Sequence, residues 1–185
     1  MGRIYLVRHP ATHMDPDTPA EQWGLSDEGL SQLDRLLQAR WWTDVRHVYT
    51  STEQKARAVG DAVLNQFGIP CTSHAELREL ERTPEFRSDY RERVIRMFAT
   101  PDVPVDGWES LSSATDRLTG FLRGTVSGGP IPAAVVSHGI VLSSVRARLL
   151  GMSHVDPRHW QALPFAAVAE VETDDWTLAS DFAPE

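Results

Sequence analysis

The sequence predicts an α/β fold: a three-layer α/β/α sandwich with a mostly parallel central sheet, in a single domain over residues 1–185. Two observations predict it. Short apolar runs typical of buried strands alternate with helix-like segments, and the connections are long enough to cross the face of a sheet. The chain, with 41% hydrophobic residues, is also long enough for one substantial core.

Extended segments mark the expected strands. They cover residues 3–8, 45–50 and 132–137, an extended stretch at 71–80, and a β-rich tail from about residue 161 to 179. Helix-like patterns cover residues 26 to about 40, 51–68, 86–99, about 109–126 and 139–150. Because strands and helices alternate, we expect a ligand site beyond the carboxyl ends of the strands.

Start and stop signals bound these helices. Ser26 can cap the first one, and the two acids that follow it suit the positive end of a helix. The second helix opens on Ser-Thr-Glu-Gln at 51–54, which has the spacing of a capping box, and stops at Gly-Ile-Pro, residues 68–70. Turns rich in proline and glycine at 101–107 and 127–130 separate the later elements.

Composition narrows the classes of partner. A net charge of −8 argues against general nucleic-acid binding, because an anionic chain repels the phosphate backbone. No apolar run approaches the roughly 20 residues of a membrane span, and no signal-type segment opens the chain, so we expect a soluble, cytoplasmic protein.

The lone Cys71 excludes an internal disulfide or a thiolate metal cluster. Neither H-E-x-x-H nor another metal-ligand spacing appears, so no metal site and no cofactor is expected.

Two histidines follow apolar strands and precede helix starts. Arg8-His9 ends the run at residues 4–7, and Ser137-His138-Gly139 follows the run at 133–136. In a parallel sheet both would reach the same edge, which is how phosphate sites are commonly built. Imidazole accepts a phosphoryl group when its attacking nitrogen is unprotonated, and Arg8 supplies a bidentate fork beside it. Lys55 lies in the first turns of a helix, where the dipole disfavours a cation, so an anionic ligand would explain its position.

Several ordered motifs resemble the histidine phosphatase superfamily, also called phosphoglycerate mutase-like. The similar elements are Leu6-Val7-Arg8-His9, Leu25-Ser26 with Gly29 and Gln32, Tyr49-Thr50-Ser51 with Lys55-Ala56, Leu77-Arg78-Glu79, Gly107-Trp108-Glu109-Ser110 with Arg117, and Ser137-His138-Gly139. The resemblance spans residues 3 to about 150, and the order of its elements makes it specific.

The resemblance implies a phosphoglycerate mutase-like fold and a metal-independent phosphomonoesterase acting on a small phosphorylated substrate. It identifies His9 as the nucleophile that forms a phosphohistidine and Glu79 as the residue that transfers protons. Arg8, Lys55 and His138 then hold the phosphate. Gly139 is also expected at the pocket.

The sequence departs from the family pattern at several positions. Pro10 replaces the usual glycine and removes a backbone N–H, while it holds His9 extended. Asp15 stands where many members carry asparagine and is a further candidate for the pocket. Thr52 and Lys55 replace the usual proline and arginine. A lysine ammonium is a point charge, whereas an arginine guanidinium can donate two parallel hydrogen bonds. The family's common G-x-W-E-G continuation is missing after Leu80.

Some alternatives stay open at the level of sequence. Arg57 could contact phosphate in place of Lys55, and Glu79 lies among other acids, namely Glu76, Glu81 and Glu85. A cofactor-dependent phosphoglycerate mutase-type phosphotransferase needs more enclosing insertion than this compact chain offers. A non-catalytic module that binds a phosphorylated ligand is the third reading. The sequence sets neither the physiological substrate nor the oligomeric state, so a homodimer is also open.

Overall fold

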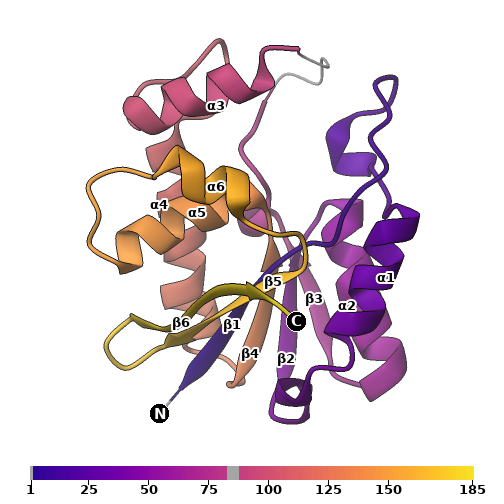
Figure 1. Cartoon of the computed structure of the whole chain (residues 1–185). Coiled ribbons are helices and arrows are strands. Elements are labelled where there is room, and N and C mark those ends of the chain that lie inside the picture. Colours follow the sequence, from indigo (N-terminus) through magenta and orange to yellow (C-terminus); the bar gives the residue numbers. More distant parts are fainter. Residues whose placement is uncertain (1, 83–87) are drawn as a thin grey trace.

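The computed structural model describes residues 2–82 and 88–185. Within them, strands β1 to β6 form one sheet in the order β3-β2-β4-β1-β5-β6 (Figure 1). The strands are β1 (Arg3–Arg8), β2 (His47–Ser51), β3 (Cys71–His74), β4 (Ala133–Ser137), β5 (Ala167–Glu172) and β6 (Thr177–Pro184). The first four pair in parallel, whereas β5 and β6 are antiparallel. The mostly parallel sheet is confirmed.

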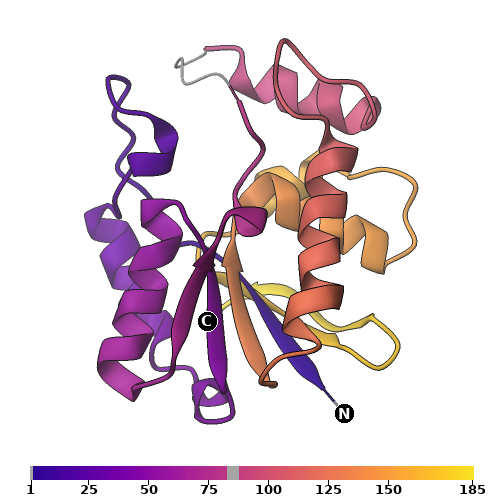
Figure 2. The same cartoon turned by 180° about the vertical axis from the view of Figure 1, so that it is seen from behind.

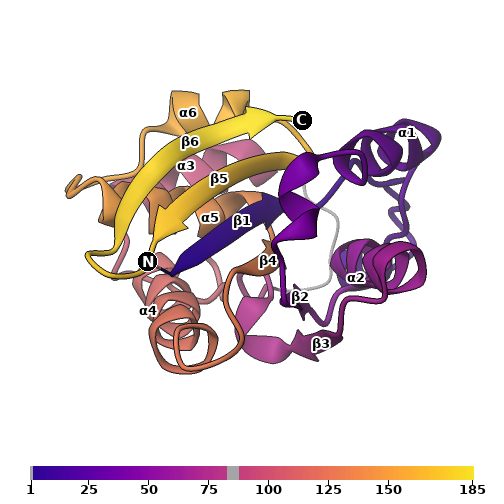
Figure 3. The same ribbon diagram turned by 90° about the horizontal axis from the view of Figure 1, so that it is seen from below.

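Helices cover both faces of the sheet. They are α1 (Asp27–Leu36), α2 (Gln54–Phe67), α3 (Tyr90–Ala99), α4 (Leu111–Phe121), α5 (Gly139–Leu149) and α6 (Pro157–Ala162). Figures 2 and 3 show α1 and α2 on one face, and α4 and α5 with α3 and α6 on the other. None of the helices in the described residues has the length and apolarity that crossing a bilayer requires. Because helices lie on both faces of the sheet, the predicted three-layer arrangement is confirmed.

Alternation along the central strands divides the core into two clusters. Ile4 and Leu6 of β1 belong to the cluster that includes α4 and α5, while Tyr5 and Val7 belong to the cluster that includes α1 and α2. Residues 133–136 of β4 divide in the same way. Because both faces are covered, these strands are continuously apolar in sequence.

The first helix starts as predicted and ends early. Ser26 Oγ accepts a hydrogen bond from Gly29 N at 3.1 Å, which confirms the cap. The helix ends at Leu36 rather than near residue 40, and a 3-10 turn follows at Arg40–Thr43. The buried Trp42 of that turn donates its indole N–H to Leu36 O at 2.7 Å, so tertiary packing satisfies a carbonyl that a longer helix would have used.

The predicted capping box at residues 51–54 is wrong. Ser51 is the last residue of β2, and helix α2 begins at Gln54 with Glu53 at the N-cap position. Ser51 Oγ accepts from Glu53 N at 3.2 Å, two residues on, instead of from an amide of the helix. The predicted end is confirmed, because Gly68 adopts the left-handed conformation (φ 69°) that terminates helices.

The middle elements differ from expectation at their ends. The stretch predicted as extended over 71–80 is a strand only to His74, and a 3-10 turn follows at Ala75–Leu77. Helix α3 begins at Tyr90, and residues 86 and 87 of its predicted span lie outside the described residues. Helix α4 continues as a π-helical turn at Leu122–Val126, so the predicted helical span of about 109–126 holds to within two residues.

The C-terminal region contains a helix that the prediction missed. Helix α6 includes residues 161 and 162, where the β-rich tail was predicted to begin, and β6 extends to Pro184 rather than to 179. The signal was present: Asp156 Oδ1 accepts from Arg158 N at 2.9 Å, and Pro157 occupies the first turn. Asp-Pro at a helix start is a standard N-terminal pattern.

Helix α1 anchors the segment that follows His9. Ala11 O accepts from Ser26 N at 3.1 Å, and Ala11 N donates to Gln32 Oε1 at 2.8 Å. Gly29 allows this approach, because a Cβ at that position would lie 1.9 Å from Ala11 O. The Leu-Ser-x-x-Gly-x-x-Gln motif is thus a docking surface for the chain beyond the first strand.

Replacing Gly29 with alanine should therefore destabilise the fold. The methyl group meets backbone, so Gly29→Ala is expected to lower the free energy of unfolding by about 2–3 kcal/mol. Gly120→Ala is the matched control, since Gly120 is exposed in α4 with open space around it; it should raise the free energy of unfolding by about 0.5–1 kcal/mol. Urea unfolding measures both, and equal effects would contradict the close packing.

Candidate active site

The pairing of β1 with β4 brings the two predicted histidines together. Arg8 lies opposite Ser137 in the parallel register, and His9 N donates to Ser137 O at 3.0 Å. The residue that follows each strand is a histidine, and the ring centroids of these two residues, His9 and His138, lie 5.0 Å apart. Both rings are buried. Residues separated by about 130 positions thus meet at the carboxyl edge of the sheet.

His9 is held as a neutral imidazole with a free basic nitrogen. Its Nδ1 lies 2.7 Å from Pro10 O, and since a carbonyl only accepts, Nδ1 carries the proton and Nε2 keeps its lone pair. Burial lowers the pKa of His9 well below its ordinary value, and the nearby charges of His138 and Lys55 lower it further. At neutral pH the Nε2 atom is therefore unprotonated.

His138 is a buried imidazole with unused hydrogen-bonding capacity. It is the N-cap residue of α5 and is 1% exposed, yet within the described residues neither ring nitrogen has a hydrogen-bond partner. Its Nε2 lies 3.3 Å from Glu53 Oε1, an approach without hydrogen-bond geometry. Burial lowers the pKa of His138 well below the ordinary value, and the charges of Lys55 and Arg82 lower it further. A ligand acceptor would satisfy this ring.

The Arg8 guanidinium is fixed next to the two histidines. Its Nη1 donates to Leu163 O, and its Cζ lies 4.0 Å from the centroid of the Phe165 ring. It also packs against Gly139, where a Cβ would lie 3.2 Å from Cζ, so the glycine makes room for the cation. Arg8 Nε is buried without a partner among the described residues. Burial lowers the pKa of Arg8, but a guanidinium stays charged.

Lys55 is buried in the site and already faces an anion. Its Nζ lies 2.5 Å from Glu53 Oε2 and donates to Ala20 O at 2.6 Å. The position of a cation near the start of α2 predicted an anionic ligand, but the structure shows that the chain supplies the carboxylate itself. Arg57 is exposed, whereas the charge of Lys55 acts on both His9 and His138.

The Glu79 carboxylate binds the N-terminus of α5. Its two oxygens accept from Ile140 N and Val141 N, each at 3.0 Å. Although part of the residue remains exposed, its carboxyl group is enclosed by protein, and this burial raises its pKa. The bond from Ile140 N and the charge of Arg82 oppose that rise, while the charge of Glu53 adds to it. The predicted alternatives Glu76 and Glu81 are exposed, and Glu85 lies outside the described residues.

Arg117 and Glu109 hold the segment that carries Glu79. Arg117 donates to the carbonyl oxygens of Glu76 at 2.7 Å, Arg78 at 3.2 Å and Glu79 at 3.3 Å. Its guanidinium also pairs with Glu109 Oε2 at 2.8 Å. Glu109 and Arg117 therefore position the segment that carries Glu79.

Two residues of the site escaped the sequence analysis. Glu53 was assigned only to a capping box, and its carboxylate instead contacts the site. Arg82 follows the segment where the family pattern is lost, yet its charge acts on Glu79 and His138, and its Cζ lies 5.1 Å from the Tyr90 ring centroid. No sequence signal marked these contacts, because Glu79 lies 26 positions from Glu53 and His138 lies far along the chain from both residues.

Asp15 does not reach the histidines through any contact that the structure gives it. Its carboxylate accepts from Asp17 N at 3.0 Å and from Thr18 Oγ1 at 2.6 Å, within its own loop. These bonds, that from Thr18 first, lower the pKa of Asp15. The residue organises a turn, which differs from the pocket role expected of it.

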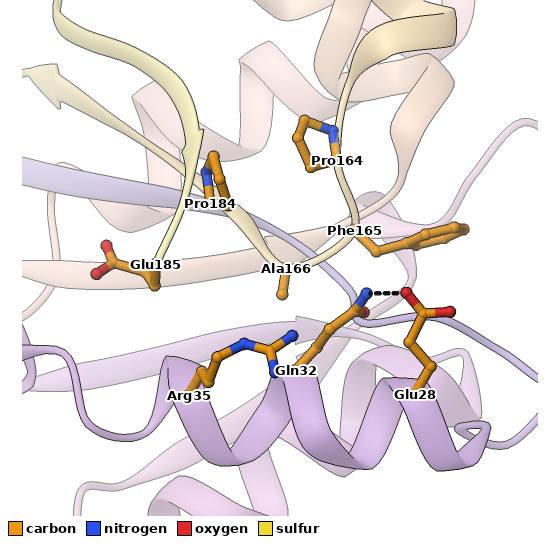
Figure 4. Close-up of a pocket in the computed structure, with 8 residues that line it drawn as sticks. All are labelled: Glu28, Gln32, Arg35, Pro164, Phe165, Ala166, Pro184 and Glu185. Atoms are coloured by element: carbon orange, nitrogen blue, oxygen red, sulfur yellow. Dashed lines mark hydrogen bonds between the residues drawn. The ribbon is translucent and has the colours of Figure 1, made fainter.

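A cavity of about 320 Å³ lies next to the site, between α1 and the C-terminal region (Figure 4). Glu28, Gln32 and Arg35 line it from α1. Phe165 belongs both to this lining and to the surroundings of His9, because its ring centroid is 5.7 Å from that of His9.

In the described part of the chain, no group of three or more histidine, cysteine, aspartate or glutamate side chains is arranged to hold a metal ion.

Comparisons with known proteins address the family and the fold of the chain. A family model described as the histidine phosphatase superfamily (branch 1) matches residues 4–181. The protein YhfR of Bacillus stearothermophilus is similar in structure, with a TM-score of 0.75, 20% identity, and coverage of 99% of this chain and 96% of that one. A comparison with curated proteins finds no match.

Two similar structures carry phosphatase names. One is a mycobacterial glucosyl-3-phosphoglycerate phosphatase with inorganic phosphate, with a TM-score of 0.75, 17% identity, and coverage of 100% and 98% of the two chains. The other is phosphoserine phosphatase of Entamoeba histolytica with 3-phosphoglyceric acid, with a TM-score of 0.76, 16% identity, and coverage of 100% and 98%. At these identities the likeness establishes the fold.

The two buried histidines should make stability depend on pH. Their pKa values are lowered in the folded state, so below about pH 6.5 the unfolded chain binds protons that the folded one does not. The free energy of unfolding should fall between pH 7 and 5, by up to about 1.4 kcal/mol per pH unit for each histidine. The raised pKa of Glu79 acts in the opposite sense, since its contribution is lost as the pH rises.

Comparing the protein with a double variant isolates the histidine contribution. His9→Gln with His138→Gln removes both titrating rings and leaves Glu79 in place, so its free energy of unfolding should fall less steeply between pH 7 and 5. Urea unfolding at several pH values measures this. Parallel curves for the two proteins would show that the rings are not held neutral by burial.

Proposed function

The chain belongs to the histidine phosphatase superfamily, and we propose that it is a metal-independent phosphomonoesterase that hydrolyses a small phosphorylated metabolite through a phosphohistidine on His9. One observation carries the proposal: His9 Nδ1 donates to Pro10 O at 2.7 Å, which leaves Nε2 as a buried free base. An unprotonated imidazole nitrogen is what a phosphoryl acceptor requires.

The polar groups around His9 suit a phosphate. Arg8 Nε and the ring nitrogens of His138 are buried without partners in the described chain, so phosphate oxygens would satisfy the N–H of Arg8 Nε and the single N–H of a neutral His138 ring. The guanidinium of Arg8 and the ammonium of Lys55 supply positive charge for the oxygens of the transferring group. These cations support a reaction that needs no metal ion.

The reaction divides into two transfers. His9 Nε2 attacks phosphorus, the N–P bond forms as the ester P–O bond breaks, and the protonated carboxyl of Glu79 gives its proton to the leaving oxygen. The resulting carboxylate then takes a proton from a water molecule that attacks phosphorus, and the N–P bond breaks with its electron pair returning to Nε2. The raised pKa of Glu79 favours the protonated form that the first transfer needs.

Removing the nucleophile should abolish turnover. His9→Ala is expected to reduce hydrolysis of an aryl phosphate by at least about 10³-fold, and a chelator should not affect the unmodified protein. His154→Ala is the matched control, since His154 is exposed, and it should retain full activity. Activity that survives in His9→Ala would overturn the proposal. If neither the unmodified protein nor His9→Ala hydrolyses any of a panel of phosphomonoesters, while inorganic phosphate still binds, the result would favour the non-catalytic module instead.

The role of Glu79 can be separated from general damage by varying the leaving group. Glu79→Gln removes the proton donor, so kcat/KM should fall by about 10²–10⁴-fold for alkyl phosphates, whose alkoxide leaves poorly. Aryl phosphates that release a stable phenolate need less help, and their kcat/KM should fall much less. An equal loss for both substrate types would show that Glu79 does not protonate the leaving oxygen.

A further inference from the structure

A second carboxylate, that of Glu53, lies within the group of candidate catalytic residues. Its side chain is 9% exposed, and its Oε2 lies 2.5 Å from Lys55 Nζ. Its other oxygen, Oε1, accepts from Glu79 N at 2.8 Å and lies 3.3 Å from His138 Nε2. One carboxylate thus touches a predicted phosphate ligand, the backbone of the predicted acid and the second histidine.

The position of Glu53 in the helix does not explain this arrangement. Glu53 is the N-cap residue of α2, where a carboxylate usually accepts from the first amides of the helix. Its side chain makes no such bond, and its own N–H is taken by Ser51 Oγ. The carboxylate is turned away from the helix and toward Lys55 and Glu79, so a stabilising effect on the helix cannot be its main role.

We propose that Glu53 is a positioning and charge-balancing residue of the phosphate site, which fixes Lys55 and the Glu79 segment and limits how tightly inorganic phosphate is held. The proposal rests on the proposed function, because it assigns Lys55 to phosphate. An incoming phosphate competes with Glu53 for the ammonium of Lys55. The same competition would help the product phosphate to leave.

The charges around the two histidines determine how the loss of the Glu53 carboxylate would change phosphate affinity. The cations acting on the two histidine rings are Arg8, Lys55, Arg82 and Arg117, and Arg117 is already paired with Glu109. In this enclosed site a charge is poorly screened, so the loss of one carboxylate strongly favours a bound anion. Glutamine removes the charge of Glu53 and keeps an oxygen for Glu79 N, whereas leucine removes both.

The experiment measures inorganic phosphate binding by calorimetry near neutral pH, together with kcat and KM. Glu53→Gln should bind phosphate about tenfold more tightly than the unmodified protein, with a lower KM. Glu53→Leu should show a lower kcat than Glu53→Gln, because the Glu79 segment loses its acceptor. Glu92→Gln, at an exposed position of α3, is the charge-matched control and should change neither quantity. Thermal unfolding confirms that each variant is folded.

A double variant tests whether the effect passes through Lys55. In a Lys55→Met background, Glu53→Gln should raise phosphate affinity clearly less than it does with Lys55 present, since the ammonium for which Glu53 and phosphate compete is gone and only their direct repulsion remains. An undiminished effect in that background would overturn the proposal, as would phosphate binding that is unchanged or weaker in Glu53→Gln.

Failure of the proposed function would be distinguishable. The proposed function fails if His9→Ala keeps its turnover, a result that does not depend on Glu53, whereas the role of Glu53 fails if Glu53→Gln leaves phosphate affinity unchanged or weaker.

Discussion

The register between β1 and β4 is the constraint on which the site depends. Arg8 lies opposite Ser137, so the residues that leave the two strands are His9 and His138, and the bond from His9 N to Ser137 O extends the pairing by one residue. A slip of one position would send each apolar side chain of β1 to the wrong face and separate the two imidazoles. The same packing that builds two apolar layers therefore fixes the chemistry at the edge of the sheet.

Burial then decides how the charged groups around these histidines are arranged. An enclosed polar or charged group without a partner is costly, and these groups have partners: Lys55 pairs with Glu53, two residues before it, and the carboxyl group of Glu79 accepts from amides of α5. Among the described residues, Arg8 Nε and the ring nitrogens of His138 are buried next to His9 without partners. Because a ligand gains most where it satisfies unpaired donors, these atoms indicate where an anion would bind.

Sequence patterns predicted what depends on neighbouring residues and on simple topology. The buried strands are continuously apolar, so their positions and the meeting of His9 with His138 could be foreseen, and Ser26 capped its helix as expected. Contacts set by tertiary structure could not be. The Glu53 carboxylate accepts from Glu79 N, 26 positions along the chain, and Asp15 bonds within its own loop. Helix α1 ends early, and the carbonyl of Leu36 at its end accepts from a buried tryptophan.

The proline after His9 fits a pocket in which side chains rather than peptide groups would hold the anion. Pro10 has no N–H, and the next amide, that of Ala11, is committed to Gln32. Two N-terminal amides of α5, those of Ile140 and Val141, which would otherwise attract a phosphate, are occupied by Glu79. The carbonyl of Pro10 meanwhile orients the His9 ring. A phosphate at this edge would therefore depend on the side chains of Arg8, Lys55 and His138, so the pairing of Lys55 with Glu53 bears directly on how the phosphate is held.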